Sequence, residues 1–414
     1  MIFTPYPHES TVINTILQIR NTDYALLRLT PTMIKKNIID ANTIFRNLLC
    51  RSGIVDYEDL DSGRDNGVEH FAKLIQKGSV ENIKMKFYRV SNRRGDRRFS
   101  IEKLKRKTLN NTLNEGDLLY IAACKTQEGS PQLFLIDLSN NTPTPEEIFN
   151  AIGKDDTLTL LDILKPRLVE ILHGGFYDNS KGSGLDSPKD IGDTLERLLE
   201  IDANNRNNAD YKGLIEIKAK GEATTRDTLF TLRPSFEGTP IALYEPTDRY
   251  RVSAFTRYYG YASEKHPDAC NLYITIGSFD APQNNQGFYL DVDEEQEKVL
   301  LVHIENSTKT TVAYWSFNKL ETALTEKHPA TLWFKGEKRQ KGDVIQFKYN
   351  EVEFTRSPQF MTFLSLIKRG LITYDWRGYT TKEGKYSGKN HGNAWRIKPH
   401  YRKELFGSIE KLSL

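Results

Sequence analysis

The stretch ADYKGLIEIKAK, residues 209–220, places charged groups inside an apolar strand pattern. Side chains alternate between the two faces of a strand, so Glu216 and Lys218 share one face and the isoleucines around them share the other. Ionisable groups beside a buried apolar run cost free energy unless solvent or a partner ion compensates them. Together with Asp210, the pattern D-x5-E-x-K predicts either a half-exposed strand with a Glu–Lys pair or a catalytic site.

The composition is that of an ordinary globular protein. The chain has 414 residues, of which 27% are charged and 38% hydrophobic, and this length predicts two or three domains. No run of about 18 apolar residues predicts a transmembrane helix, and the first ten residues lack a signal-peptide pattern. Cys50, Cys124 and Cys270 lie far apart, which argues against a zinc site and a disulfide framework. We therefore expect a cytoplasmic protein without membrane partners.

The net charge of +3 hides two basic segments. Residues 82–107 contain eleven Lys and Arg against two acidic residues, and residues 369–403 contain nine against two. Aromatic residues are interleaved with the basic ones in both segments. One such segment could be a solvated loop, but two with aromatic residues favour nucleic acid as the partner.

The N-terminal part shows short apolar runs separated by polar turns. Residues 30–49 have helical spacing of apolar residues after a Thr-Pro start. Expected strands lie at 24–34, 82–90, 97–101, 116–125 and 131–138. Short strands with polar turns predict a mainly β domain, a small barrel, over residues 1–145.

The C-terminal part alternates strands with helices. Residues 146–160 follow a segment rich in Pro, Asn and Thr and are the expected linker, which leaves residues 161–414 as the second domain. Helical patterns at 193–201, 319–327 and 360–371 are separated by strand patterns. Strands with flanking helices predict a mixed α/β domain.

Three carboxylates and a lysine carry the expected chemistry. Glu196 lies on the expected helix 193–201, fourteen residues before Asp210. If Glu196, Asp210 and Glu216 converged on one point, they would repel one another unless a hard cation sat between them. Oxygen ligands without His or Cys suit Mg²⁺, with Asp210 and Glu216 as the expected metal ligands. Water on Mg²⁺ can attack a phosphodiester, and Lys218 would orient that water or stabilise charge on the phosphate.

Residues 182–220 resemble the catalytic core of the PD-(D/E)XK nucleases, in the branch of MvaI, BcnI and the nicking enzyme MutH. That branch has a helix with an internal Glu, then Asp, then E-x-K, and the set Glu196, Asp210, Glu216 and Lys218 is similar to it position by position. The segments AYWSFNKLETAL (313–324) and SGKNHGNAWRI (387–397) are similar to two further MvaI-like segments. Ala209 departs from the usual Pro before the catalytic Asp.

The resemblance implies a mixed sheet flanked by helices and a Mg²⁺-dependent enzyme that binds double-stranded DNA. In MvaI-like enzymes the C-terminal basic segment reads base edges, so the resemblance implies recognition by Arg377, His391 and Arg396. The alternatives are an exposed or capping role for His391 and a phosphate contact for Arg396. Asn393 is expected to contact either bases or backbone.

The N-terminal domain resembles, over residues 85–107 and 115–122, the B3-like effector domain of EcoRII-type enzymes. Such domains are β-pseudobarrels that grip the DNA major groove with two arms. The resemblance implies that five residues of the basic segment contact DNA, namely Arg93, Arg94, Arg97, Arg98 and Lys105. A B3-like domain before an MvaI-like nuclease is similar to the arrangement of type IIE restriction enzymes.

The sequence therefore predicts a type II restriction endonuclease, acting as a monomer, that cuts a CCWGG-like site and binds a second site through its N-terminal domain. One alternative is a MutH-like mismatch-repair nicking enzyme, which would depend on a partner. The other is a DNA-binding protein with a degenerate nuclease fold, although a degenerate site would usually have lost one of the four catalytic positions.

Overall fold

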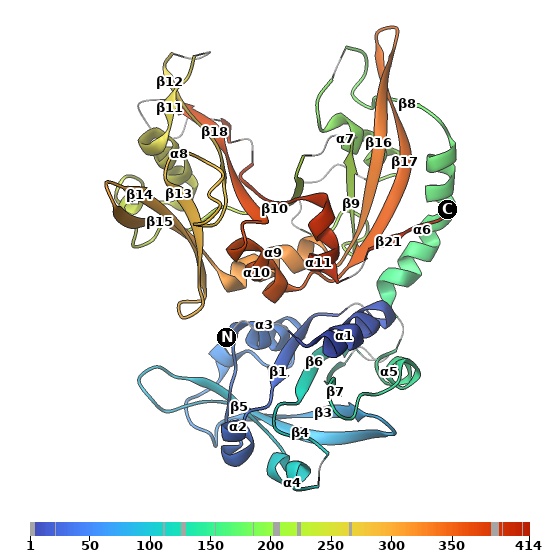
Figure 1. Cartoon of the computed structure of the whole chain (residues 1–414), viewed down its shortest axis with the longest axis vertical. Coiled ribbons are helices and arrows are strands. Elements are labelled where there is room, and N and C mark those ends of the chain that lie inside the picture. Colours follow the sequence, from blue (N-terminus) through green and yellow to red (C-terminus); the bar gives the residue numbers. More distant parts are fainter. Residues whose placement is uncertain are drawn as a thin grey trace. The chain divides into compact units, whose positions relative to one another are not determined.

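The computed structural model shows two compact units, Thr4–Ile163 and Leu164–Leu414 (Figure 1). The boundary between them lies inside helix α6 (Asp156–His173). The expected linker, residues 146–160, consists of most of helix α5 (Pro145–Ile152), a short connection and the start of α6. The residues that the structure describes are 5–20, 22–110, 112–125, 130–153, 155–184, 186–201, 208–221, 225–264, 267–381, 389–390, 392–407 and 409–414.

The first unit is built on one seven-stranded sheet with the order β1-β6-β7-β3-β4-β5-β2. All neighbours are antiparallel except β3 and β7. The expected strands at 82–90 and 97–101 form the antiparallel pair β4–β5, and those at 116–125 and 131–138 form the antiparallel pair β6–β7. In the described residues β1 and β2 are the two ends of the sheet and do not pair, so the predicted B3 pseudobarrel stays a prediction.

The strands of this sheet are β1 (Tyr24–Arg28), β2 (Ile39–Asp40), β3 (Val68–Gln76), β4 (Ser79–Arg89), β5 (Arg97–Ile101), β6 (Leu118–Lys125) and β7 (Pro131–Asp137). Besides α5 and the start of α6, the unit has the helices α1 (Pro7–Ile19), α2 (Pro31–Lys36), α3 (Thr43–Arg51) and α4 (Leu104–Leu109).

The prediction of one helix over residues 30–49 was wrong. The chain forms α2, the short strand β2 and then α3. Asn37 ends α2 in the left-handed conformation (φ 48°), which Asn tolerates better than most residues and which stops a helix. Asn42 then caps α3, because its side-chain oxygen accepts a hydrogen bond from the backbone N–H of Phe45. Two asparagines thus divide a stretch whose apolar spacing alone indicates one helix.

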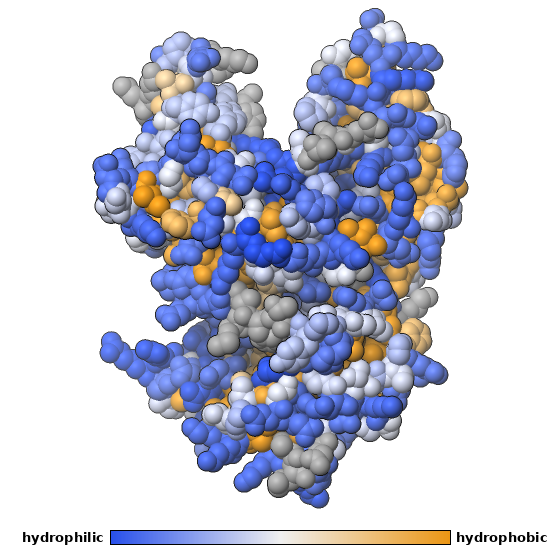
Figure 2. Space-filling view, viewed as in Figure 1, coloured by the Kyte–Doolittle hydropathy of each residue, from blue (hydrophilic) through white to orange (hydrophobic). Residues whose placement is uncertain are grey.

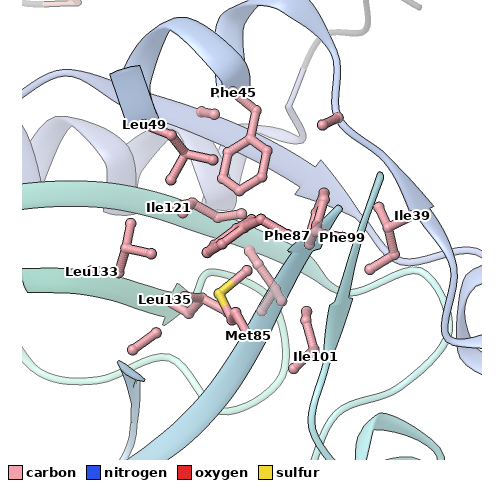
Figure 3. Packing of buried hydrophobic residues seen from close by; sticks show 14 of the residues in the cluster. Ile39, Phe45, Leu49, Met85, Phe87, Phe99, Ile101, Ile121, Leu133 and Leu135 are labelled. Atoms are coloured by element: carbon pink, nitrogen blue, oxygen red, sulfur yellow. The ribbon is translucent and has the colours of Figure 1, made fainter. Parts of the chain in front are cut away.

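Helix α3 covers one face of the first unit's sheet, and the aromatic residues between them form the core (Figure 3). The ring of Phe45 lies 4.5 Å from that of Phe99 and 6.2 Å from that of Phe87, between centroids. Ile121 and Leu135 from the neighbouring strands complete the cluster. Burying such side chains stabilises a fold by about 1.5–3 kcal/mol each, so this unit has a core of its own.

The second unit contains three sheets. The first, with the order β21-β17-β16-β9, is mixed because β9 and β16 are parallel while the other neighbours are antiparallel. The second has the order β10-β20-β18-β12-β11 and is antiparallel, and the third is the antiparallel sheet β13-β14-β15. The predicted mixed α/β architecture is therefore confirmed.

The strands of the second unit are β8 (Tyr177–Asp178), β9 (Ile215–Lys220), β10 (Asp227–Thr231), β11 (Tyr261–Ala262), β12 (Ala269–Ile276), β13 (Phe288–Asp293), β14 (Lys298–Glu305), β15 (Thr308–Ser316), β16 (Ala330–Lys341), β17 (Val344–Arg356), β18 (Ile372–Thr381), β19 (Lys389–Asn390), β20 (Ala394–Ile397) and β21 (Glu410–Lys411). Its helices after α6 are α7 (Asp190–Leu198), α8 (Asp248–Tyr259), α9 (Phe317–Lys327), α10 (Phe360–Lys368) and α11 (Arg402–Phe406).

Within the second unit, β9, β16 and β17 form one lobe, and β12 and β18 belong to another (Figure 1). Helix α7 packs on β9, and α8 packs on β12 and β18. Figure 2 shows this unit hollowed between the two lobes, with hydrophilic residues along the walls. In the described part of the chain, no helix is long and apolar enough to span a membrane.

Candidate active site and DNA-recognition face

A tight turn before β9 brings Asp210 beside Glu216. The bridges between Ala209 and Gly213 and between Tyr211 and Ile215 fold the chain back over the start of the strand. Gly213 has a φ of 72° there, a conformation that glycine adopts without strain. The backbone N–H of Ile217 donates a hydrogen bond of 3.2 Å to Oδ2 of Asp210. The predicted pair of metal ligands is therefore assembled by a local turn.

Glu216 is fully buried, with 0% of its side chain exposed. The Lys218 Nζ lies 2.5 Å from Oε1 of Glu216, so the strand places the two predicted catalytic groups in direct contact. Burial raises the pKa of Glu216 to about 7, and the neighbouring Asp210 acts in the same direction while the lysines oppose it. The site therefore holds a carboxyl group whose charged form is disfavoured.

Lys327 at the end of α9 is a member of the site that the sequence did not predict. Its Nζ lies 3.0 Å from Oδ1 of Asp210 and 2.8 Å from Oε2 of Glu216, so it bridges the two carboxylates. Burial disfavours its charge, but the two carboxylates outweigh burial and raise the pKa of Lys327. The residue lies more than a hundred positions beyond the E-x-K motif, and no spacing rule links it to that motif.

Glu196 lies on α7, the helix that packs on β9. Burial raises its pKa, and the nearby charges of Asp210 and Asp193 add to this effect. The charge of Asp210 thus acts on Glu196, and the catalytic role of Glu196 stays a prediction. In the described residues, however, no group of three or more His, Cys, Asp or Glu side chains lies close enough together to hold a metal ion as it stands.

The residues at the centre of the site fit a divalent cation. Neither oxygen of Glu216 has an aligned hydrogen-bond donor in the described part of the chain, although both oxygens are buried and the two lysines lie close. A buried carboxylate with unused lone pairs beside a second carboxylate is an oxygen-only donor set. Mg²⁺ is typically bound by one or two carboxylates, several waters and substrate phosphate. Asp210 and Glu216 are the residues that would hold it.

The other lobe presents two of the predicted recognition arginines. Arg377 on β18 and Arg396 on β20 share one buried partner, because Oδ2 of Asp375 lies 2.7 Å from Nη2 of Arg377 and 2.8 Å from Nη1 of Arg396. Thr275 donates a hydrogen bond of 3.0 Å to the other oxygen of Asp375. The Arg377 side chain is 37% exposed and that of Arg396 17% exposed. The arginines are therefore held in place without a ligand.

The register of this sheet separates a polar face from an apolar one. Tyr273 stands opposite Arg377, and Thr275 stands opposite Asp375, so these side chains share a face. The side chains of Trp376 on β18 and Trp395 on β20 lie on the opposite face of the sheet, and both are fully buried. A sheet with one face buried in this way holds its register, because a slip by one residue would expose the tryptophans.

The other predicted recognition residues have different positions. Asn393 is buried, and its Oδ1 accepts a hydrogen bond of 2.9 Å from the backbone N–H of Arg377. It thus helps to fix the strand that carries Arg377, and a contact between Asn393 and DNA stays a prediction. His391 lies outside the described residues.

The five predicted DNA contacts of the first unit differ in their surroundings. Arg93 and Arg94 are exposed in the turn between β4 and β5, and Lys105 is exposed on α4. Arg97 and Arg98, on β5, are paired with acidic residues from other segments, namely Glu58 at 2.6 Å and Asp40 at 3.0 Å. Arg93, Arg94 and Lys105 are therefore more available to a polyanion than the paired Arg97 and Arg98.

One family profile and two solved structures are similar to part of this chain. The profile of the MvaI/BcnI restriction endonuclease family matches residues 166–406. The solved structure of a restriction endonuclease MvaI–cognate DNA substrate complex is similar, with 24% sequence identity, a TM-score of 0.50, and coverage of 61% of this chain and 97% of that chain. The structure of restriction endonuclease MvaI in the absence of DNA has 22% identity, a TM-score of 0.37, and coverage of 61% and 96%.

No curated protein sequence matches this chain. The family match covers the unit that carries both lobes, the Asp210–Glu216–Lys218 site and the paired arginines. The chain belongs to the MvaI/BcnI restriction endonuclease family.

Proposed function

We propose that the protein is a Mg²⁺-dependent type II restriction endonuclease that hydrolyses both strands of duplex DNA at a CCWGG-like site. The observation that carries this proposal is the assembly of Asp210, Glu216 and Lys218 on one lobe, with the paired arginines on the other lobe of the same unit. The hollow between the lobes supports duplex DNA as the substrate (Figure 2).

Each residue has a role that its position supports. Asp210 and Glu216 would hold the cation, which would supply Lewis acidity and lower the pKa of a water. Lys218, in contact with Glu216, is placed to orient the attacking water and to stabilise negative charge on the phosphate. Glu196, with its raised pKa, is a further carboxyl group at the edge of the site.

Sequence readout is assigned to Arg377 and Arg396. An Arg that donates two hydrogen bonds to O6 and N7 of guanine is the commonest specific contact in the major groove, and a site rich in G·C pairs suits it. Asp375 fixes both guanidinium groups before DNA arrives, which reduces the entropy lost on binding. Arg377 is the better candidate for a base contact because more of its side chain is exposed.

The test is cleavage of plasmid DNA by the purified protein in Mg²⁺, followed by sequencing of the ends. Cleavage of both strands at one short sequence is the expected result. The matched control is Asp210→Ala, which should bind the same DNA in Ca²⁺ but fail to cut it in Mg²⁺. Near-normal cleavage by Asp210→Ala would overturn the site assignment. Nicking that requires added repair proteins would favour the MutH-like alternative, and binding without cleavage would favour the degenerate one.

We further propose that the first unit binds a second copy of the site, so that the protein is a type IIE enzyme and acts as a monomer. The exposed basic turn with Arg93 and Arg94 supports this, as does the resemblance of the two-domain arrangement to that of the type IIE enzyme UbaLAI. Two sites on one DNA raise the effective concentration of the second site.

A comparison of plasmids tests the second-site proposal. A two-site plasmid should be cut faster than a one-site plasmid, and a short cognate duplex added in trans should accelerate cutting of the one-site plasmid. Coupling between sites is typically worth about 1–3 kcal/mol, or roughly 5- to 150-fold. Arg93→Ala/Arg94→Ala should lose the stimulation but keep specific cleavage. Equal rates on both plasmids, unchanged by the duplex, would reduce the first unit to a general DNA anchor.

A further inference from the structure

A partly buried ion pair joins strand β9, which carries the E-x-K motif, to strand β10 of the sheet that carries the two arginines. Lys220 lies two residues beyond Lys218 on β9, on the same face of the strand. Its Nζ lies 3.1 Å from Oδ1 of Asp227, the first residue of β10. Asp227 is 9% exposed and Lys220 24% exposed, so solvent screens this pair only weakly. Nζ of Lys220 also donates to the carbonyl of Thr225 in the same connection.

Asp227 connects this ion pair to the candidate recognition arginines. The carbonyl of Arg226, next to Asp227 in the chain, accepts a hydrogen bond of 2.6 Å from Nη2 of Arg396. Nη1 of the same guanidinium lies 2.8 Å from Asp375, which in turn holds Arg377. A chain of polar contacts therefore runs from the strand of the E-x-K motif to both arginines.

Strand pairing runs in parallel with these polar contacts. Asp227 stands opposite Ile397 and Thr228 stands opposite Arg396, so β10 carries the Lys220 partner and supports the Arg396 strand at once. Arg402 on α11 is a second cation near Asp227, 3.7 Å away, and its guanidinium lies 4.6 Å from the ring of Trp333 on β16. Lys220 on β9 and Arg402 on α11 thus both contact the start of β10.

We propose that Lys220 and Asp227 are positioning residues that hold the catalytic strand in register with the base-reading arginines. This inference rests on the proposed function, because it concerns how that function is made specific. Near-attack geometry is sensitive, and a misplacement of about 1 Å can cost on the order of 10²-fold in rate. The pair fixes the position of the catalytic strand relative to the arginines. When the arginines bind the correct bases, the scissile phosphate therefore lies beside Lys218.

The alternative role for Lys220 is a direct contact with a DNA phosphate. The two roles predict different behaviour in a double-mutant cycle. Residues that act as a unit are not additive, so after Asp227→Asn the further change Lys220→Met should cost little. A phosphate contact would make Lys220→Met cost its full amount in either background. If Lys220 contacted a phosphate, Lys220→Met would also reduce the number of counterions released on DNA binding by about one, so binding would depend less steeply on salt.

The experiment measures single-turnover cleavage in Mg²⁺ and DNA binding in Ca²⁺ on full-length protein. The variants are Lys220→Met, Lys220→Arg, Asp227→Asn and Lys220→Met/Asp227→Asn. The matched control is Lys335→Met, because Lys335 stands beside Lys220 on β16 but pairs with Glu351 at the surface. Each protein is tested on a cognate duplex and on one with a single altered base pair. Thermal midpoints are compared to check folding.

The expected result is a loss of at least about tenfold in cognate cleavage for Lys220→Met and Asp227→Asn, with cognate affinity changed less than about threefold. The ratio of cognate to altered-site cleavage should fall, the double variant should match the singles, and Lys220→Arg and Lys335→Met should cleave like wild type. Normal cleavage by Lys220→Met, additive losses, or a shallower salt dependence would overturn the proposal. Absence of cleavage in every protein, wild type included, would overturn the proposed function as well.

Discussion

Replacing Glu216 by Gln should stabilise the metal-free protein at alkaline pH, although it removes a catalytic group. The carboxyl group of Glu216 is buried, and its pKa is raised from 4.5 to about 7. At about 1.4 kcal/mol per pH unit, this shift corresponds to roughly 3 kcal/mol. Because the pKa is raised, wild type should lose that stability as the pH rises from 4.5 through 7. Glu216→Gln cannot ionise and should not lose it.

Urea unfolding in EDTA, followed by tryptophan fluorescence between pH 5 and pH 8, measures the difference. All four tryptophans, at positions 315, 333, 376 and 395, lie in the second unit, so the signal reports the unit that holds Glu216. The free energy of unfolding of Glu216→Gln relative to wild type should increase by roughly 3 kcal/mol across this range. Adding Mg²⁺ at pH 8 should stabilise wild type more than the variant, because ligand binding to the native state stabilises it.

Glu351→Gln is the control, since hydrogen bonds from Lys411 and Lys335 lower the pKa of Glu351. The difference between Glu351→Gln and wild type should be small and nearly constant between pH 5 and pH 8, because this surface group titrates below that range. A constant difference between Glu216→Gln and wild type across the range would show that Glu216 does not carry a raised pKa. The inference that the buried carboxylate of Glu216 needs a cation to stabilise its charged form would then fail.

Three further expectations follow from the same geometry. Lys327→Met should move the pH-dependent loss of stability to higher pH in the same urea experiment, because Lys327 lowers the pKa of Glu216; an unchanged midpoint would contradict the contact. Burial lowers the pKa of His328 to about 3, so wild type should lose stability relative to His328→Gln as the pH falls below 6.5, measured by acid titration in urea. Arg377→Ala should cost about 1–3 kcal/mol of discrimination at one base pair, measured with single-substitution duplexes, whereas a uniform loss on all sequences would mark a phosphate contact.

The local motif was predictable because its geometry follows from strand alternation. Glu216 and Lys218 had to share a face, and the structure brings them into contact. Lys327 was not predictable, because its position depends on a parallel pairing. β16 lies beside β9 with Ala330 opposite Ile215, so the residues that precede both strands meet at one edge of the sheet. The carbonyl of Glu326 accepts a hydrogen bond from the N–H of Ala209 at that edge.

The charge of a sequence window was a poorer guide than the motif. Residues 82–107 carry a strong positive charge in the sequence, yet several of their basic side chains pair with acidic residues from elsewhere. Arg97 pairs with Glu58 and Lys84 with Glu69, and in each pair the two residues come from different elements of the chain. The net charge of the full window therefore overestimates the basic surface available to DNA.

Two buried carboxylates of the second unit, Asp375 and Glu216, are compensated in opposite ways. Asp375 has two guanidinium groups within 2.8 Å and a hydroxyl at 3.0 Å, so its lone pairs are used as soon as the chain folds. Glu216 has two ammonium groups close by, but its pKa is raised to about 7 and no donor in the described residues is aligned with its oxygens. The proposed recognition arginines are therefore already paired in the folded protein, whereas the oxygens of Glu216 keep lone pairs that a cation could use. From this difference we expect that DNA binding through Arg377 does not require a metal, whereas cleavage does.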